Sequence, residues 1–288
     1  MNMIPVLVMT FLCLSFGQNV YWISSVSGIW EDDFNWDPFF PSDSNDVIIP
    51  YTQHDILIKV LTDHTLSSLE VHNSTTLQLE LNASITVTES SHWKGGVLCG
   101  AGGSESLFVT TSLLIDSLGT VSVMNVSIHI RDELIIQRGR MTSSRATLVL
   151  DGDLSSTTIT DPLLFDLLVF GQNDCPTINL NTDLHVDKFD WYCGSIEGVG
   201  QFNVSHLNLY SNGTKTLDIT SNFTVFDEIT TDSSQILFFN KTFLHFPQDV
   251  EVRCAPNSEF KLYSLNDHDS FLYNIASMFL IVNLPSST

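Results

Sequence analysis

The amino-acid sequence predicts an all-β protein whose main body is a right-handed parallel β-helix, also called a β-solenoid. Two observations lead to this fold class: short triplets with two apolar residues around one outward residue recur along the chain, and a tryptophan–glycine motif occurs twice. We expect a signal peptide at 1–17, a tryptophan-rich N-terminal cap at 18–44 and the solenoid at 45–265. The C-terminal segment, 266–288, is expected to form a last strand or the start of a truncated continuation.

The first segment contains an uncharged apolar stretch, Val6 to Phe16, with the length of a signal-peptide core. This stretch is too short to cross a bilayer as a helix. Ser15 and Gly17 occupy the −3 and −1 positions of a cleavage site before Gln18. The positive residues usual at the start of a signal peptide are missing, and a buried strand or a signal anchor is the alternative. We therefore expect a secreted, extracellular or cell-surface protein.

The second segment is rich in aromatic side chains: Trp22, Trp30, Phe34, Trp36, Phe39 and Phe40. The open end of a solenoid exposes apolar interior and unpaired strand edges, so it needs a cap. These side chains are expected to form that cap. The alternative is a carbohydrate-binding platform in which exposed indole rings stack on sugars.

The strand triplets begin with Leu69-Glu70-Val71, Leu77-Gln78-Leu79 and Ile85-Thr86-Val87, each eight residues after the last. This spacing leaves room only for tight turns, and the turns carry Asn, Ser, Thr, Asp and Gly as turn chemistry requires. A β-sandwich is the alternative, with longer strands and more Asn-Gly hairpin signals, of which Asn212-Gly213 is the one clean example. The short, regular spacing favours a solenoid.

The tryptophan–glycine motif has the form Trp-x-x-Gly-x-apolar-x-Gly-x-Gly. Its two copies run from Trp93 to Gly102 and from Trp191 to Gly200. Glycines at this spacing suit tight corners where neighbouring coils approach closely. No helical pattern and no P-loop lysine follow the glycines, so they do not form a phosphate-binding loop.

Together with the sequence Gly-x-Trp…Asn-Trp…Pro…Asp-x-Val-Ile-Ile-Pro of residues 28–50, this motif resembles the right-handed β-helix ectodomains of surface proteins in protists and of bacterial adhesin-like proteins. These ectodomains have the pectate-lyase-like superfold. The resemblance covers most of residues 22–262. It implies a fold and an extracellular setting, and it carries over no catalytic or ligand-binding residue.

Seven Asn-x-Ser/Thr sequons follow the signal peptide, at Asn73, Asn82, Asn125, Asn203, Asn212, Asn222 and Asn240. In a secreted eukaryotic protein such asparagines are acceptors of N-linked glycans. We expect several of them to be glycosylated.

Removal of the leader leaves four cysteines, at Cys99, Cys175, Cys193 and Cys254. An even number without Cys-x-x-Cys spacing fits two disulfides in an oxidising compartment better than a zinc site. Three pairings are possible, and the short loop between Cys175 and Cys193 favours that pair. No free thiol is expected.

The charge balance excludes one class of partner. Asp and Glu number 33 against 11 Lys and Arg, for a net charge of −22. A surface this acidic repels phosphate backbones, so we expect no nucleic-acid binding. An extracellular glycan or protein is the expected partner, and the chain is not expected to be an integral membrane protein. The nine histidines are scattered singly, so neither a metal nor a cofactor is expected.

The expected function is binding, adhesion or a structural role, with no catalytic activity and no residue assigned as catalytic. The alternative is a polysaccharide lyase or glycoside hydrolase on the same scaffold. For that alternative the best candidates are Asp151, Asp153 and Arg145, because acidic and basic residues meet around residues 131–153.

Overall fold

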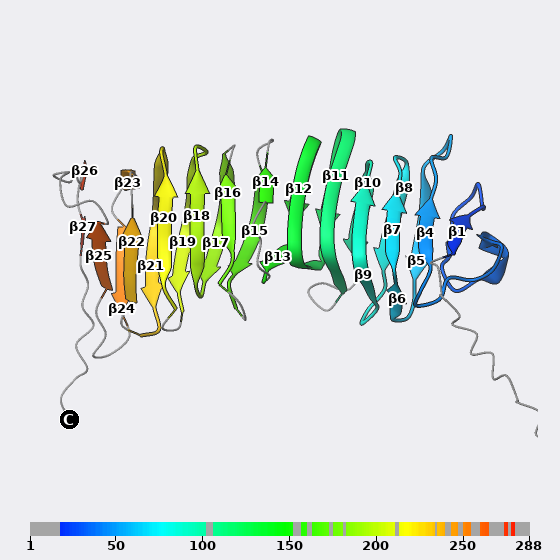
Figure 1. Cartoon of the computed structure of the whole chain (residues 1–288), viewed down its shortest axis with the longest axis horizontal. Coiled ribbons are helices and arrows are strands. Elements are labelled where there is room, and N and C mark those ends of the chain that lie inside the picture. The colour runs from blue at the N-terminus through cyan, green and yellow to red at the C-terminus, as the bar shows by residue number, and fades with distance from the viewer. Residues whose placement is uncertain are drawn as a thin grey trace, which may run out of the picture.

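The computed structural model describes residues 18–101, 106–151, 157–159, 163–172, 175–180, 183–210, 213–233, 235–239, 243–246, 250–254, 260–264, 274–275 and 278–279. Strands account for 67% of the chain and helix for 2%, which confirms the predicted all-β class. The strands stack along the long axis of the molecule from β1 (Asn19–Trp22) to β27 (Met278–Phe279) (Figure 1). In the described part of the chain, no helix is long and apolar enough to cross a membrane.

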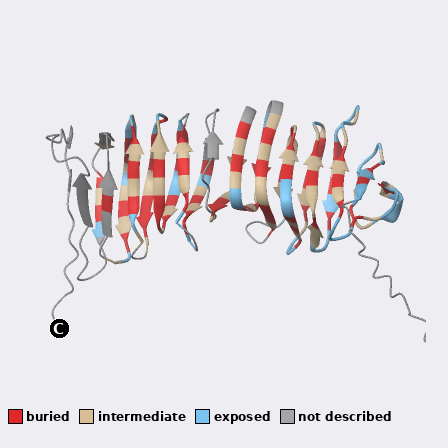
Figure 2. Cartoon of the chain, in the orientation of Figure 1, coloured by how far each residue is buried: buried red, intermediate tan, exposed pale blue. Residues whose placement is uncertain are grey.

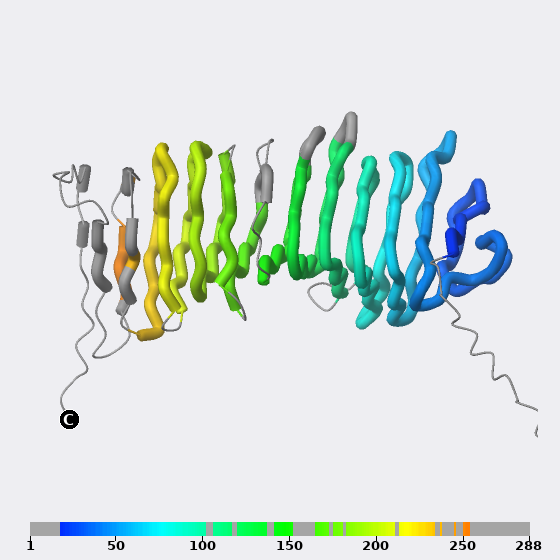
Figure 3. Tube along the Cα trace, viewed as in Figure 1, coloured from blue at the N-terminus to red at the C-terminus, as the bar shows by residue number. Residues whose placement is uncertain are grey.

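The chain winds in successive coils along the long axis (Figure 3). Beyond the N-terminal segment 19–37, each coil contributes strands to three faces, and these strands pair in parallel with strands of the neighbouring coils. On face 1, Val47 pairs with Leu69, which follows 22 residues later. On face 3, Phe189 pairs with Leu207, which follows 18 residues later. Parallel neighbours one coil apart define a β-solenoid, so the predicted architecture is confirmed.

The faces consist of the following strands. Face 1 contains β4 (Asp46–Ile49), β7 (Ser68–Val71), β14 (Thr157–Ile159), β16 (Thr177–Leu180), β18 (Gly194–Gly198), β20 (Lys215–Ile219), β22 (Gln235–Phe239) and β25 (Phe260–Ser264). Face 2 contains β5 (Ile56–Val60), β8 (Thr75–Leu79), β10 (Gly96–Gly100), β23 (Phe243–Phe246) and β26 (Asn274–Ile275). Face 3 contains β6 (His64–Leu66), β13 (Thr147–Leu150), β24 (Val250–Cys254) and β27.

Longer strands continue from one face to the next: β9 (Ser84–Trp93), β11 (Leu107–Met124), β12 (Ser127–Ser144), β15 (Leu163–Phe170), β17 (Leu184–Trp191), β19 (Phe202–Leu209) and β21 (Asn222–Thr231).

The core lies inside the coils, because alternate residues of each strand point inward (Figure 2). In β5, Ile56, Ile58 and Val60 are buried while Lys59 is exposed. This alternation is the one that the triplets predicted. Full burial of one such side chain stabilises the fold by about 1.5 to 3 kcal/mol.

Aromatic side chains contact one another across coils in the second half of the core, in tilted and edge-to-face pairs. The ring of Phe202 lies 5.0 Å from that of Phe189 and 5.2 Å from that of Phe223. Phe202 and Phe223 occupy matching positions on neighbouring coils. Each such contact adds about 0.5 to 1.5 kcal/mol beyond the burial of apolar area.

Both copies of the tryptophan–glycine motif form corners. Trp93 ends β9 on face 1, Trp191 ends β17 on face 3, and both side chains are buried. The glycines that follow include Gly194 and Gly198, with φ angles of +109° and +121° that disfavour other residues. The predicted close approach of coils is therefore confirmed. The two copies nevertheless lie at different corners, so the motif is a local corner device and not a repeat of the coil.

At the N-terminal end, β1 pairs in parallel with β4, and β2 (Gly28–Ile29) pairs in parallel with β5. Faces 1 and 2 thus continue into the segment expected to form the cap. The 3-10 helix Asp33–Asn35 then leads into β3 (Trp36–Asp37), which pairs antiparallel with β1. Because β3 occupies the edge of β1 that faces away from β4, that edge is not open for further parallel pairing.

Three tryptophans pack together inside this cap. The rings of Trp22 and Trp30 lie 5.1 Å and 4.7 Å from that of Trp36, and all three are buried. The Trp36 indole N–H donates to the Trp30 carbonyl at 2.6 Å. The aromatic cap is confirmed, and the alternative of sugar-stacking indoles is wrong because the rings are enclosed. Phe34, 90% exposed, lies outside this cluster.

A glutamate ties the cap to the first coil. Glu31 Oε1 lies 2.9 Å from His64 Nε2 and accepts hydrogen bonds from the backbone amides of Leu61 and Thr62 at 2.9 and 3.0 Å. Burial alone would raise the pKa of Glu31, but these hydrogen bonds outweigh it, and the pKa is lowered. The carboxylate form therefore stabilises the junction between cap and solenoid.

Candidate functional site

Five of the seven sequon asparagines lie among the described residues, and Asn212 and Asn240 lie outside them. Asn73, Asn82 and Asn125 lie in turns or bends between strands, Asn203 lies within β19, and Asn222 begins β21. Asn73, Asn82 and Asn222 are exposed, and Asn125 and Asn203 are half-buried. Glycosylation itself stays a prediction.

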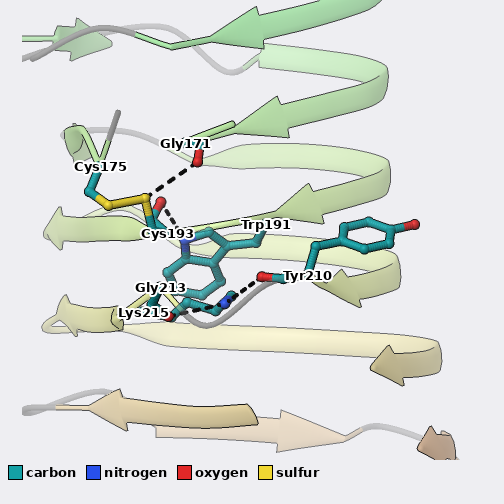
Figure 4. Close-up of a disulfide and its surroundings, with 7 residues drawn as sticks. All are labelled: Gly171, Cys175, Trp191, Cys193, Tyr210, Gly213 and Lys215. Carbon is teal, nitrogen blue, oxygen red and sulfur yellow. Dashed lines mark hydrogen bonds between the residues drawn. A yellow bond between two sulfur atoms is a disulfide. The ribbon is translucent and has the colours of Figure 1, made fainter. Parts of the chain in front are cut away.

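Cys175 and Cys193, the pair favoured by its short loop, form a disulfide with their Cα atoms 4.9 Å apart (Figure 4). Cys99, in contrast, is a free thiol, so the expectation of two disulfides with no free thiol is wrong. Four parallel pairings separate β10, which carries Cys99, from β17, which precedes Cys193. At about 4.8 Å for each pairing the separation is roughly 19 Å, far beyond the reach of a disulfide. Cys254 ends β24, further along the same axis.

A buried lysine lies beside the disulfide. Lys215 is fully buried, and its Nζ donates to the carbonyl oxygens of Tyr210 and Gly213 at 2.9 and 3.2 Å (Figure 4). Burial lowers the pKa of Lys215 to about 8, and the negative charge of Asp232 partly opposes this effect. Because the amine is enclosed, it bridges Tyr210 and Gly213 and is not available to a substrate.

The candidates for an enzyme are not brought together. Arg145 precedes β13 and Asp151 follows it, so an extended strand of four residues separates them. Six residues of extended chain span about 20 Å, well beyond hydrogen-bond reach. Asp153 lies outside the described residues. The backbone amide of Asp151 donates to Ile130 at 3.2 Å, which places it beside the coil that carries Arg131.

A glutamate on the outer surface of face 1 gathers two basic side chains. Glu70 Oε1 lies 2.5 Å from both His72 Nε2 and Lys94 Nζ. Burial alone would raise the pKa of Glu70, but the contacts with Lys94 and His72 outweigh it, and the pKa is lowered. A general acid needs a raised pKa, so Glu70 does not fit that role. Among the described residues, no three His, Cys, Asp or Glu side chains lie close enough together to hold a metal ion.

A surface cleft of about 710 Å³ opens beside the cap. One wall is formed by residues 21–26, which begin in β1, and the other by residues 50–54, which link β4 to β5. The pairing of β1 with β4 brings these two segments together. Tyr21 and Tyr51 lie in opposite walls and are 38% and 62% exposed. The two segments contain no Asp, Glu, Lys or Arg.

Sequence analysis did not single out Tyr21 or Tyr51. The signal for Tyr21 was its position between Val20 and Trp22, which are both buried, so that alternation points the tyrosine outward. For Tyr51 there was no comparable signal, because it lies in an irregular segment after β4.

Comparison with known proteins found no family model, no curated protein and no solved structure that matches this chain.

Proposed function

We propose that the chain is a secreted or cell-surface glycoprotein with a binding or adhesive role and no catalytic activity. The observation that carries this proposal is the cleft at the capped end of a rigid rod, in which exposed aromatic side chains and uncharged polar groups converge. A solenoid alone would not suffice, because the same fold can carry either enzymes or binding surfaces. The apolar leader, the sequons and the Cys175–Cys193 disulfide support the extracellular setting.

The separation of candidate acids and bases also supports a role without catalysis. Acid–base catalysis requires a donor and an acceptor within hydrogen-bond reach of one reacting group. Arg145 and Asp151 lie at opposite ends of β13, and Glu70 is held by Lys94 and His72. The alternative function, that of a polysaccharide lyase or glycoside hydrolase, is therefore not proposed, and the functional test includes an assay that would detect it.

The extracellular part of the proposal is tested by expression of the full chain in a eukaryotic cell. We expect the secreted protein to begin at Gln18 and to lose mass on treatment with an N-glycosidase. Asn82→Gln should remove one glycan, because Asn82 is exposed in a turn. The matched control is Asn179→Gln, since Asn179 is not followed by the Asn-x-Ser/Thr pattern. A chain that starts at Met1 and carries no glycan would contradict the proposal.

The binding part is tested with the same secreted protein on a glycan array and in a polysaccharide-degradation assay. Binding without turnover is the expected result. Turnover of any polymer that Asp151→Asn or Asp153→Ala abolishes would establish the enzyme instead.

A further inference from the structure

The two tyrosines of the cleft present a surface that is apolar on the ring face and polar at the hydroxyl. Tyr21 is held in β1, where it pairs with Ile48 of β4 and with Asp37 of β3. Tyr51 lies in the facing wall and is the more exposed of the two. Pyranose sugars carry C–H groups on their ring faces and hydroxyls around their edges, so they pack against such rings while hydrogen-bonding sideways.

The polar groups of the walls match the edge of a sugar. Ser24 and Ser25 contribute hydroxyls from one wall, and Thr52, Gln53 and His54 contribute a hydroxyl, an amide and an imidazole from the other. Hydroxyls, amides and imidazoles both donate and accept hydrogen bonds, as sugar hydroxyls do. A pocket of 300 to 1,000 Å³ is the usual size for a small ligand, and the cleft, at about 710 Å³, lies within that range.

The absence of charged side chains from the walls favours an uncharged ligand over an anionic or a cationic one. The whole chain carries a net charge of −22, yet neither wall contains an Asp, Glu, Lys or Arg side chain. An anionic ligand would meet no cation in the cleft and would be repelled by the surrounding acidic surface. A cationic ligand would find no carboxylate to pair with. An uncharged ligand fits both facts.

The walls are held in place before any ligand binds. The Trp22 indole N–H donates to the Ser24 carbonyl at 2.8 Å, and the Ser24 hydroxyl donates to the Val26 carbonyl at 3.0 Å. In the other wall the Thr52 hydroxyl donates to the His54 carbonyl at 2.6 Å. A loop that becomes ordered only on binding loses conformational entropy, which lowers the affinity for the ligand. Because these walls are already ordered, that cost is reduced.

From these observations we infer that the cleft between residues 21–26 and 50–54 binds an uncharged sugar unit of a glycan. This inference rests on the proposed binding function and names its ligand class. Tyr51 and Tyr21 pack against the sugar ring. Ser25 and Gln53 donate to and accept from its hydroxyls, whereas the Ser24 and Thr52 hydroxyls, which donate within their own walls, accept from them.

The test is isothermal titration of the secreted, folded protein with cellotriose, maltotriose, mannotriose, galactotriose and triacetylchitotriose, and with trigalacturonate as an anionic comparator. We expect at least one neutral trisaccharide to bind more tightly than trigalacturonate. Tyr51→Ala should weaken that binding by about tenfold or more, which corresponds to about 1.4 kcal/mol. Tyr51→Phe, which keeps the ring, should retain most of it.

The matched control is Phe34→Ala, since Phe34 is an exposed aromatic residue of the same cap that does not line the cleft. Its affinity should stay within twofold of the unaltered protein. Four results would overturn the inference. The first two are that no neutral trisaccharide binds at about 10 mM, a concentration that detects even millimolar affinities, and that trigalacturonate binds as tightly as the best neutral trisaccharide. The other two are that Tyr51→Ala binds that trisaccharide normally, and that the cleft instead joins two copies of the chain in a dimer that Tyr51→Ala dissociates. Glycan-array binding that survives Tyr51→Ala would overturn this inference alone, whereas a chain without array binding, processing or glycans would defeat the proposed function itself.

Discussion

Gly198 lies directly against the carbonyl oxygen of Leu180 on the preceding coil: a Cβ at position 198 would be 2.2 Å from that oxygen. In addition, the φ angle of Gly198 is +121°, a backbone conformation that residues with a Cβ atom rarely adopt. We expect Gly198→Ala to lower the free energy of unfolding by about 2 kcal/mol or more, because coil and corner must both shift. Urea denaturation measures this. The control is Val199→Ala at the exposed neighbouring position, and equal stability of the two variants would contradict the close contact.

The disulfide gives a prediction about cysteine chemistry. Cys175 and Cys193 are 18 residues apart, and cross-linking a loop of about that length stabilises a fold by about 3 kcal/mol. The double variant Cys175→Ala/Cys193→Ala should therefore unfold at clearly lower urea, while Cys99→Ser should differ little from the unaltered protein. Alkylation of the native protein followed by peptide mapping should label Cys99 slowly, because burial and then the charge of Glu80 raise its thiol pKa. Labelling of Cys175 or Cys193 without reductant would refute the pairing.

The lowered pKa of Lys215 leads us to expect that the free energy of unfolding rises with pH in the alkaline range. Its pKa is about 8 in the folded chain and 10.5 at its ordinary value, so between these values the unfolded chain binds more protons. The free energy of unfolding must then rise with pH in this window, by about 2 kcal/mol between pH 7.5 and 9.5. Below about pH 8 the amine is charged in both states, and no such rise occurs. Lys215→Met should abolish the rise.

Measurements for this test should stop near pH 9.5, because burial raises the pKa of Tyr192 and of Tyr210, and these groups act in the opposite direction at higher pH. A stability profile that is flat from pH 7.5 to 9.5 in the unaltered protein would show that Lys215 is not buried as described.

The lowered pKa of Glu31 leads us to expect a loss of folding stability at acidic pH. Its folded-state pKa is below the ordinary value of 4.5, so its contribution is complete above pH 4.5 and disappears as the pH falls through the folded value. Glu31→Gln should lower the stability of the cap at pH 7 by about 1 to 2 kcal/mol, because a charged acceptor of four hydrogen bonds is replaced by a neutral one. Three of the five tryptophans lie in the cap, so tryptophan fluorescence during urea unfolding reports mainly on this segment. The exposed Glu89→Gln serves as control, and identical behaviour of both variants at pH 7 and pH 3.5 would contradict the prediction.

Much of the fold could be predicted from the sequence because a solenoid repeats one simple rule. The three triplets between Leu69 and Val87 gave the inward and outward residues correctly, since alternation along a strand is a local property. The triplet Leu107-Phe108-Val109 was wrong, because its central residue, Phe108, is fully buried. Lys215 could have been found by the same rule, because it alternates with the buried Leu217 and Ile219. It was missed because apolar residues alone were counted as inward.

The site could not be predicted, because it depends on the lengths of coils. Val20 pairs with Val47, 27 residues later, whereas Phe189 pairs with Leu207 after only 18. No local pattern gives these lengths, so neither the placement of Tyr21 and Tyr51 in one cleft nor the distance from Cys99 to the other cysteines followed from spacing. The pairing of Cys175 with Cys193 was accessible because one short coil contains both.

The direction of the hydrogen bonds between coils has a mechanical consequence. These bonds run along the long axis of the molecule, so tension on its two ends pulls each bond lengthwise and peels coils off one at a time, from either end (Figure 1). Each detached coil lengthens the chain sharply, which lets the molecule yield in steps under load. The disulfide prevents the 18-residue segment from Cys175 to Cys193 from extending under tension. About 60 Å of extended chain therefore becomes available only after a reductant cleaves the disulfide.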